Sequence, residues 1–242
     1  MESLQSAGYA IINDVFTAEE ITGILDTINK IDTSGPAFRK TNDLFAIRRF
    51  VKEVPDITPL IFNSRLCEII NQLFGNNYFL VKSIYFDKPE QSNWFVAYHQ
   101  DLTISVEQKI ACEGFDQWTV KNNQFAVQPP VELLENIFTI RIHLDDTDEN
   151  NGALKIVPGS HRKGIYRPET INWSKEKEVV CQVPRGGIMI MQPLLLHASN
   201  RTANNNKRRV IHLEFSDRQL PGGLQWAEYL SLNNFPIRKI NI

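Results

Sequence analysis

The sequence predicts a mainly β fold, a jelly roll or barrel, with helices packed against its outside. Two helical patterns lie within about the first 76 of the 242 residues. From Asn77 onward the helical spacing gives way to short apolar or alternating segments, separated by turn residues. Many short strands after a helical section are typical of a closed or two-layered β fold.

The N-terminal region predicts a short strand and then a helix. Gly8–Ile12 is a short apolar run, and Thr17 begins a capping box in which its hydroxyl accepts from the N3 amide while Glu20 reaches back. An apolar face at helical spacing follows, made of Ile21, Ile24, Leu25 and Ile28. We therefore expect a helix from about Ala18 to Lys30.

A second helix is expected from around Asn63 to Phe74. Its apolar residues recur at helical spacing, at Leu66, Ile69, Ile70 and Leu73. Gly75 is the stop, because glycine readily adopts the conformation that ends a helix.

Seven strands are expected in the remainder of the chain, with one long segment unassigned. Asp101–Pro130 shows no clear alternation and is long enough to be a functional insertion over a barrel mouth. We expect one domain over residues 1–242, with a helical section to about 76, a jelly-roll core to about 216 and a C-terminal tail from 217 to 242. The predicted strands are Tyr78–Phe86, Trp94–Tyr98, Thr139–Leu144, Ala153–Val157, Glu178–Val183, Gly187–Gln192 and Arg209–Phe215.

Charge, cysteine content and apolar run length indicate which partners and which cellular compartment to expect. The net charge is -2, and no basic stripe is present, so we expect no nucleic-acid partner. Three scattered cysteines form neither a metal signature nor a disulfide framework, which suits a reducing compartment. The first residues lack the pattern of a signal peptide, and the apolar runs are too short to span a membrane. We expect a cytoplasmic protein with a small-molecule substrate and no membrane partner; its oligomeric state cannot be read from the sequence.

His99, Asp101 and the distant His197 form a candidate metal site. Two imidazoles and one carboxylate are the facial set that holds non-haem Fe(II) and leaves three positions open. Residues i and i+2 of a strand point to the same side, so His99 and Asp101 can reach one ion while Gln100 points away. His197 follows an apolar strand that ends at Leu196, so it is expected at a strand end.

Other interpretations of these residues exist. A His-x-Asp pair often occurs by chance, each histidine can be a hydrogen-bonded core residue, and Asp101 can be a turn former. His161, within Pro158–His161, is better interpreted as part of a structural loop. His143 and His212 lie in predicted strands, where they can be core or pocket residues.

The order of four motifs resembles the phytanoyl-CoA dioxygenase family. The resemblance spans roughly Val81 to Phe215 and is far more specific than the three candidate ligands alone. It implies a double-stranded β-helix core (a cupin-like jelly roll), Fe(II), and 2-oxoglutarate as co-substrate beside O2. The motifs are Phe95–Thr103, Leu144–Leu154, Val157–His161, and His197–Asn200 followed by Arg208.

The resemblance also implies residue roles. His99, Asp101 and His197 match the iron ligands and so the catalytic centre. Arg208 matches the arginine that pairs with the far carboxylate of 2-oxoglutarate, and Ser199 matches a serine that contacts the same carboxylate. A planar guanidinium suits this task because it forks onto a carboxylate and stays charged. Arg209 competes with Arg208, but neighbours in a strand face opposite ways, so only one of the two points inward.

Three further cofactor-binding candidates rest on weaker signals. Arg141 shares a strand face with His143, which is either the interior or the outside. Lys82 lies on a strand that runs either into the pocket or past it. Trp118 is either a co-substrate contact or a packing residue of the insertion. Cations in Phe38–Arg49 either bind an acidic substrate or, as we favour from the sequence, lie on a solvated surface.

The predicted function is an Fe(II)- and 2-oxoglutarate-dependent dioxygenase that hydroxylates a small organic substrate and releases succinate and CO2. Related halogenases replace the carboxylate ligand with a small residue, so Asp101 favours hydroxylation. Two alternatives are a non-catalytic or otherwise metallated cupin-type binding module, and a zinc hydrolase with one open position for water. Neither alternative explains why Arg208 and Ser199 accompany His197.

Overall fold

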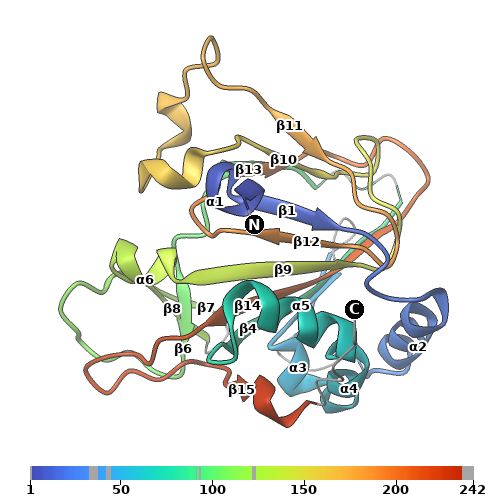
Figure 1. The fold of residues 1–242 in the computed structure, drawn as a ribbon, viewed down its shortest axis with the longest axis horizontal. Helices are drawn as coiled ribbons and strands as arrows, with labels where there is room; N and C mark the ends of the chain where they lie inside the picture. The colour runs from blue at the N-terminus through green and yellow to red at the C-terminus, as the bar shows by residue number, and fades with distance from the viewer. Residues whose placement is uncertain are drawn as a thin grey trace.

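A large antiparallel sheet forms the centre of the computed structural model, which describes residues 2–32, 38–41, 45–90, 92, 94–121 and 124–235. In these residues the sheet has the strand order β1-β12-β9-β14-β4-β3-β2, and β15 also pairs with β4 (Figure 1). The strands are β1 (Tyr9–Ile12), β2 (Phe38–Lys40), β3 (Phe45–Arg48), β4 (Phe79–Lys88), β9 (Ile137–His143), β12 (Ile188–Met191), β14 (Arg208–Ser216) and β15 (Leu230–Ser231).

A second sheet lies over one face of the main sheet. It has the order β11-β10-β13-β5, and its strands are β5 (Val96–His99), β10 (Leu154–Ile156), β11 (Val179–Cys181) and β13 (His197–Ser199). Leu154, Ile156 and Cys181 of this sheet pack against Met189 and Met191 of β12 in one buried cluster. The two sheets therefore face each other across an apolar layer.

Helices cover the opposite face of the main sheet, where α2 to α5 lie on the side away from β10 and β11 (Figure 1). The side chains of β14 face the two sides in turn, and Ile211, Leu213 and Phe215 join the core that the helices share. The helices are α1 (Glu2–Ala7), α2 (Ala18–Asn29), α3 (Phe50–Glu53), α4 (Thr58–Ile61), α5 (Ser64–Phe74) and α6 (Val131–Glu135), with single 3-10 turns at Pro55–Ile57, Ser160–Lys163, Pro168–Thr170 and Leu232–Asn234.

Both predicted helices are confirmed, together with their caps. The Thr17 hydroxyl accepts from the Glu20 amide at 3.2 Å, and the Glu20 carboxylate accepts from the Thr17 amide at 2.8 Å. Asn63 caps α5 by accepting from the amide of Leu66 at 2.8 Å. Gly75 ends α5 with a φ of 86°, which glycine adopts without strain.

The segment Asp101–Pro130 departs from its prediction, because it forms a third sheet. Its order is β6-β8-β7, from β6 (Ile104–Val106), β7 (Asp116–Lys121) and β8 (Gln124–Gln128). The register of β7 shifts between Asp116 and Thr119, and Gln117 between them has a φ of 53°. Such a bulge interrupts the period-two pattern, which is why the sequence showed no alternation.

Two other expectations need correction. The N-terminal section contains more strands than expected: β1 matches the predicted strand at Gly8–Ile12, but β2 and β3 also join the main sheet. His197 opens strand β13 instead of following a strand that ends at Leu196, since β12 already ends at Met191. The end of the predicted C-terminal tail, residues 236–242, lies outside the described residues. None of the helices that the structure describes is long and apolar enough to cross a membrane.

Candidate metal centre

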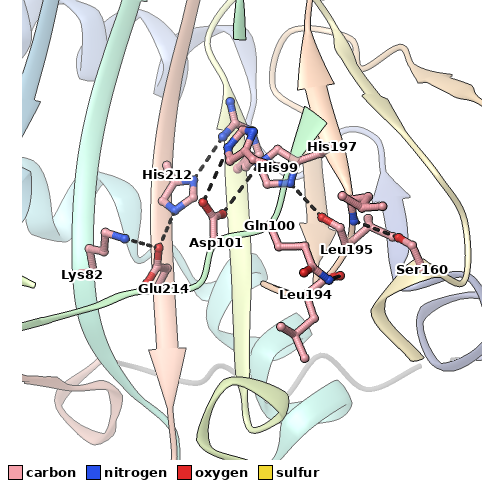
Figure 2. A network of polar contacts seen from close by, with 12 residues as sticks. Lys82, His99, Gln100, Asp101, Ser160, Leu194, Leu195, His197, His212 and Glu214 are labelled. Atoms are coloured by element: carbon pink, nitrogen blue, oxygen red, sulfur yellow. Dashed lines mark hydrogen bonds and ion pairs between the residues drawn. The ribbon is translucent and has the colours of Figure 1, made fainter. Parts of the chain in front are cut away.

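The second sheet brings the three predicted metal ligands together. Strand pairing sets His99 opposite His197, and their ring centroids lie 4.2 Å apart. The carboxylate of Asp101 lies below both rings (Figure 2), 3.9 Å from Nε2 of His99 and 3.8 Å from Nε2 of His197. One ligand atom from each of the three residues lies within 4.8 Å of the other two.

Backbone hydrogen bonds fix which nitrogen of each imidazole faces Asp101. Nδ1 of His99 lies 2.9 Å from the carbonyl oxygen of Ala97, and Nδ1 of His197 lies 2.9 Å from that of Leu195. A carbonyl only accepts, so each Nδ1 carries the proton and each Nε2 presents a lone pair to the centre. This is the form in which histidine binds a metal, with its second nitrogen held by a protein acceptor.

The charge states suit a cation at this point. Burial lowers the pKa of His197 to about 4, against the opposing effect of Asp101, so its imidazole is neutral near pH 7. Burial by itself would raise the pKa of Asp101, but His197, His212, Lys82 and His99 lower it below its usual range. Asp101 is therefore a carboxylate that faces the neutral imidazole of His197 and Nε2 of His99.

Gln100 anchors the segment between the two ligands. Its amide donates to the carbonyl oxygens of Gly164 at 2.9 Å and Leu194 at 2.6 Å, and its Oε1 accepts from the amide of Tyr166 at 2.8 Å. Gln100 points away from the centre that His99 and Asp101 share, as the alternation along a strand predicts. The backbone amide of Asp101 donates to Pro193 at 2.9 Å, which holds it beside the turn before His197.

A second cluster of polar side chains lies next to Asp101, on the inner face of the main sheet (Figure 2). Arg141 donates to Nδ1 of His212 at 3.1 Å, so His212 carries its proton on Nε2 and donates to Glu214 at 2.9 Å. Lys82 donates to the same Glu214 oxygen at 2.7 Å. Ligand atoms of Asp101, His212 and Glu214 also lie within 4.8 Å of one another.

Glu214 was missed from the sequence, although a signal was present. It follows Arg208 at even spacing along β14, so an inward-facing Arg208 also turns His212 and Glu214 inward.

Arg208 is buried on this inner face with unmet hydrogen-bonding capacity. It is 3% exposed, and within the described structure its Nε and Nη1 have no partner. Burial, with the neighbouring charge of Arg141, lowers the pKa of Arg208 to about 9. Arg209 takes the other face, where it binds Asp145 at 2.6 and 2.9 Å. The prediction that only one of the two arginines points inward is confirmed.

Ser199 and Arg141 add further unpaired donors. The hydroxyl of Ser199 and Nε of Arg141 are buried, and neither has a partner in the described part of the chain. Arg141 and His143 share the interior face, which settles the choice left open by the sequence. Burial lowers the pKa of Arg141 to about 10 and, with both arginines, holds the pKa of His143 well below its usual value.

The structure places the remaining candidates differently. Lys82 lies within the second polar cluster, paired with Glu214. Trp118 lies in β7, where its ring packs against the core of the third sheet and Lys109 lies 5.8 Å from its centroid. No contact that the structure describes brings Trp118 to the three ligands. His161, expected in a structural loop, has its Nε2 3.2 Å from the carbonyl oxygen of Gln5.

The arrangement offers two kinds of binding. Two imidazoles that turn Nε2 toward one carboxylate suit Fe(II) or a similar divalent metal, which keeps its other positions open. A buried guanidinium that lacks an acidic partner suits a carboxylate, because its planar donors match two oxygens. A dicarboxylate that reaches from the metal to Arg208 satisfies both.

Comparisons with known proteins agree with this geometry. Residues 4–210 match the family described as Phytanoyl-CoA dioxygenase (PhyH). A probable alpha-ketoglutarate-dependent hypophosphite dioxygenase of Stutzerimonas stutzeri is 22% identical over 240 residues, covering 86% of this chain and 74% of that protein. The ectoine dioxygenase of Bordetella bronchiseptica is 24% identical over 174 residues, covering 68% of this chain and 49% of its own length.

Solved structures share the fold. The crystal structure of EctD from S. alaskensis in its apoform has a TM-score of 0.68 at 18% identity, covering 89% of this chain and 75% of that one. HygX from Streptomyces hygroscopicus, solved with nickel and 2-oxoglutarate bound, has a TM-score of 0.62 at 15% identity and covers 96% of both chains.

Proposed function

The chain belongs to the phytanoyl-CoA dioxygenase family, and from that membership we propose that it hydroxylates a small organic substrate at an iron centre held by His99, Asp101 and His197. The protein is a 2-oxoglutarate-dependent dioxygenase, with iron and 2-oxoglutarate as its cofactors. The two facing sheets are assigned to a double-stranded β-helix (jelly-roll, cupin-like) core within one domain.

The observation that carries the iron assignment is the orientation of the two histidines. Each has its Nδ1 proton engaged by the carbonyl oxygen two residues earlier, so both Nε2 lone pairs face the Asp101 carboxylate. The residues present therefore fit the metal. When bound there, Fe(II) supplies the open positions at which O2 and the co-substrate react.

The residues around Arg208 fit the co-substrate. The guanidinium of Arg208 and the hydroxyl of Ser199 are buried donors without partners in the described structure, and we assign them to the distal carboxylate of 2-oxoglutarate. Arg141 is assigned a supporting role, as a second cation on the same face. The far carboxylate offsets the cost of burying an unpaired guanidinium, so the protein binds 2-oxoglutarate in one orientation.

Protein side chains then determine the outcome of the reaction. Asp101, as a carboxylate ligand, occupies the place that a halide would need, so the expected product is an alcohol, released with succinate and CO2. The second polar cluster holds Arg141 and His212 in fixed positions and keeps the inner face of the main sheet ordered. Relatives named for hypophosphite and for ectoine support a small-molecule substrate.

The test is anaerobic spectroscopy of the protein with Fe(II) and 2-oxoglutarate. We expect a weak metal-to-ligand charge-transfer band from the chelate, absent in His197→Ala. Arg208→Met should keep the band but require at least about 10-fold more 2-oxoglutarate, since a charge-assisted hydrogen bond contributes about 1.5–3 kcal/mol. Arg209→Met is the matched control, because it removes the neighbouring guanidinium from the other face. A wild-type protein that binds metal without forming the band would refute the proposal.

A further inference from the structure

A cavity of about 630 Å³ lies between β4 and the third sheet, beside the metal centre. β4 contributes Lys82, Ser83 and Ile84 to its wall. The third sheet and its flanks contribute mainly hydroxyl and amide groups, from Thr103, Ser105, Gln108, Thr119 and Gln124. The volume is in the range of small-molecule sites, about 300–1,000 Å³.

The inner end of the cavity approaches the iron ligands. Lys82 lines the cavity and lies 2.7 Å from Glu214, whose carboxylate belongs to the cluster with His212 and Asp101. On β14, Arg208 lies on one side of His212 and Glu214 on the other. The co-substrate and the cavity contents therefore approach the metal from opposite ends of one strand.

Cations outnumber acids among the residues that line the cavity, although Arg49 and Lys82 also pair with Glu53 and Glu214 behind the wall. Its cations are Arg48, Arg49, Lys52 and Lys82, and its acids are Glu107 and Glu228. Glu228 is buried and accepts from the amide and hydroxyl of Ser83, at 2.8 and 2.5 Å. Burial raises the pKa of Glu228 to about 7, so it carries only part of its charge near neutral pH. A concave wall in which cations outnumber acids favours ligands of negative charge.

A backbone turn places two neighbouring arginines in this wall. Adjacent strand residues normally face opposite ways, but Arg49 has a φ of 53° at the junction of β3 and α3, and both Arg48 and Arg49 line the cavity. Arg49 pairs with Glu53 at 2.9 Å, while its Nε is buried and has no partner in the part of the chain that the structure describes. A left-handed conformation is uncommon for a residue with a side chain.

From these observations we infer that the substrate is a small polar organic anion. Its carboxylate or phosphoryl group is bound on the Arg48, Arg49 and Lys52 side of the cavity, and the rest of the molecule extends past Lys82 to the metal centre. The inference rests on the proposed function and adds the substrate class. At Arg48 and Arg49 it favours substrate binding, the alternative to a solvated surface; the side chains of Arg39 and Lys40 lie outside the described residues.

Calorimetry with matched probes tests the charge preference. The full chain is loaded with Mn(II) and saturating 2-oxoglutarate, which occupies the Arg208 pocket, and is titrated with propionate, ethylphosphonate, propionamide and propylamine. We expect one of the two anions to bind at least about 10-fold more tightly than propionamide, a difference of about 1.4 kcal/mol. The tighter anion identifies the acidic group as carboxylate or phosphoryl. Equal or tighter binding of the amide or the amine overturns the inference.

Variants of the cavity wall test the position of the anion. The double variant Arg49→Gln/Lys52→Gln should weaken binding of the preferred anion at least about 10-fold. Lys30→Gln, which removes an exposed cation at the end of α2, should leave it unchanged. Unweakened binding in the double variant overturns the inference.

The Fe(II)–2-oxoglutarate absorption band separates the two claims and checks that each variant is folded. A band in all proteins without any preference for anions refutes the substrate class alone. Absence of the band in the wild type refutes the proposed function, and the substrate class with it.

Discussion

Two buried serines have opposite surroundings, which gives a prediction at the scale of the residue. Ser199 has no hydrogen-bond partner for its hydroxyl in the described structure, whereas Ser83 donates to Glu228 and accepts from the amide of Val51 at 2.9 Å. Ser199→Ala should leave the free energy of unfolding unchanged or raise it, and weaken 2-oxoglutarate binding at least about 10-fold, because a hydrogen bond to a charged group contributes about 1.5–3 kcal/mol.

Ser83→Ala is the matched control for this pair. It leaves the buried amide of Val51 without its acceptor and removes one of the two hydrogen bonds from Ser83 to the buried Glu228 carboxylate, so it should lower the free energy of unfolding by about 1–3 kcal/mol. Urea unfolding and calorimetric titration of 2-oxoglutarate measure both quantities. Equal losses of stability in the two variants would contradict the distinct roles assigned to the serines.

Glu228 gives a pH dependence with a definite sign. Burial raises its pKa in the folded protein to about 7 from an ordinary value near 4.5, so the folded state holds the proton more tightly than the unfolded chain does. The stabilisation is complete below pH 4.5 and is lost as pH rises to 7, by about 3 kcal/mol at about 1.4 kcal/mol per pKa unit. Glu228→Gln should remove this loss. In urea unfolding, the free energy of unfolding of the variant should therefore rise relative to that of the wild type between pH 5 and pH 8. A constant difference across that range would refute the assignment.

The His-x-Asp part of the site was predictable because a strand repeats every two residues, and the Arg208 or Arg209 choice followed from the same rule. Glu228 was not predictable as a site residue, and for Arg49 the sequence allowed both substrate binding and a solvated surface. Glu228 reaches Ser83 through a contact between distant parts of the chain, and Arg49 enters the cavity through a single left-handed residue. Neither the long-range contact nor the left-handed conformation produces a periodic pattern in the sequence.

At the scale of the element, two glycines separate the effect of backbone geometry from that of helix propensity. Gly186 has a φ of 82°, a Cβ there would lie 2.4 Å from the carbonyl oxygen of Phe16, and its amide donates to His143 at 2.8 Å. Gly23 lies inside α2 with nothing within 4 Å of such a Cβ. Gly186→Ala should therefore destabilise by more than about 2 kcal/mol, and Gly23→Ala should stabilise by about 1 kcal/mol. Thermal unfolding of the two variants measures this, and the same sign of change in both would contradict it.

The elements that were predicted correctly share strong local signals. α2 and α5 have caps and an apolar face within a dozen residues, so their boundaries follow from local chemistry. The three-residue strand β13 and the bulged strand β7 depend on pairing with distant partners. Their sequences carry too little local pattern to reveal them.

At the scale of the whole molecule, the ligand-free protein is expected to be less stable than it could be. Arg208 is a buried charge without a partner in the described residues, and such a group costs free energy that an anion recovers. Addition of Mn(II) and 2-oxoglutarate at about 100 times the dissociation constant should raise the free energy of unfolding by about 2.7 kcal/mol.

The variant Arg208→Met completes this comparison. Without ligands it should be at least as stable as the wild type, because the unpaired charge is gone. With Mn(II) and 2-oxoglutarate it should gain markedly less, since its affinity for the co-substrate is lower. Thermal scans with and without EDTA measure both effects. A variant that gains as much as the wild type would show that Arg208 does not hold the co-substrate.

Strand β14 connects the proposed co-substrate site to the cavity. Arg208 at its start is proposed to bind the co-substrate, and Glu214 near its end contacts Lys82 at the cavity wall. Because a strand rises by about 3.4 Å per residue, the separation of Arg208 and Glu214 along β14 is fixed. New substrate preferences in relatives are thus expected to arise in β3, β8 and the loops of the third sheet, where exchanges leave β14 intact. Directed evolution for a different substrate has the best prospects when its libraries are confined to those segments.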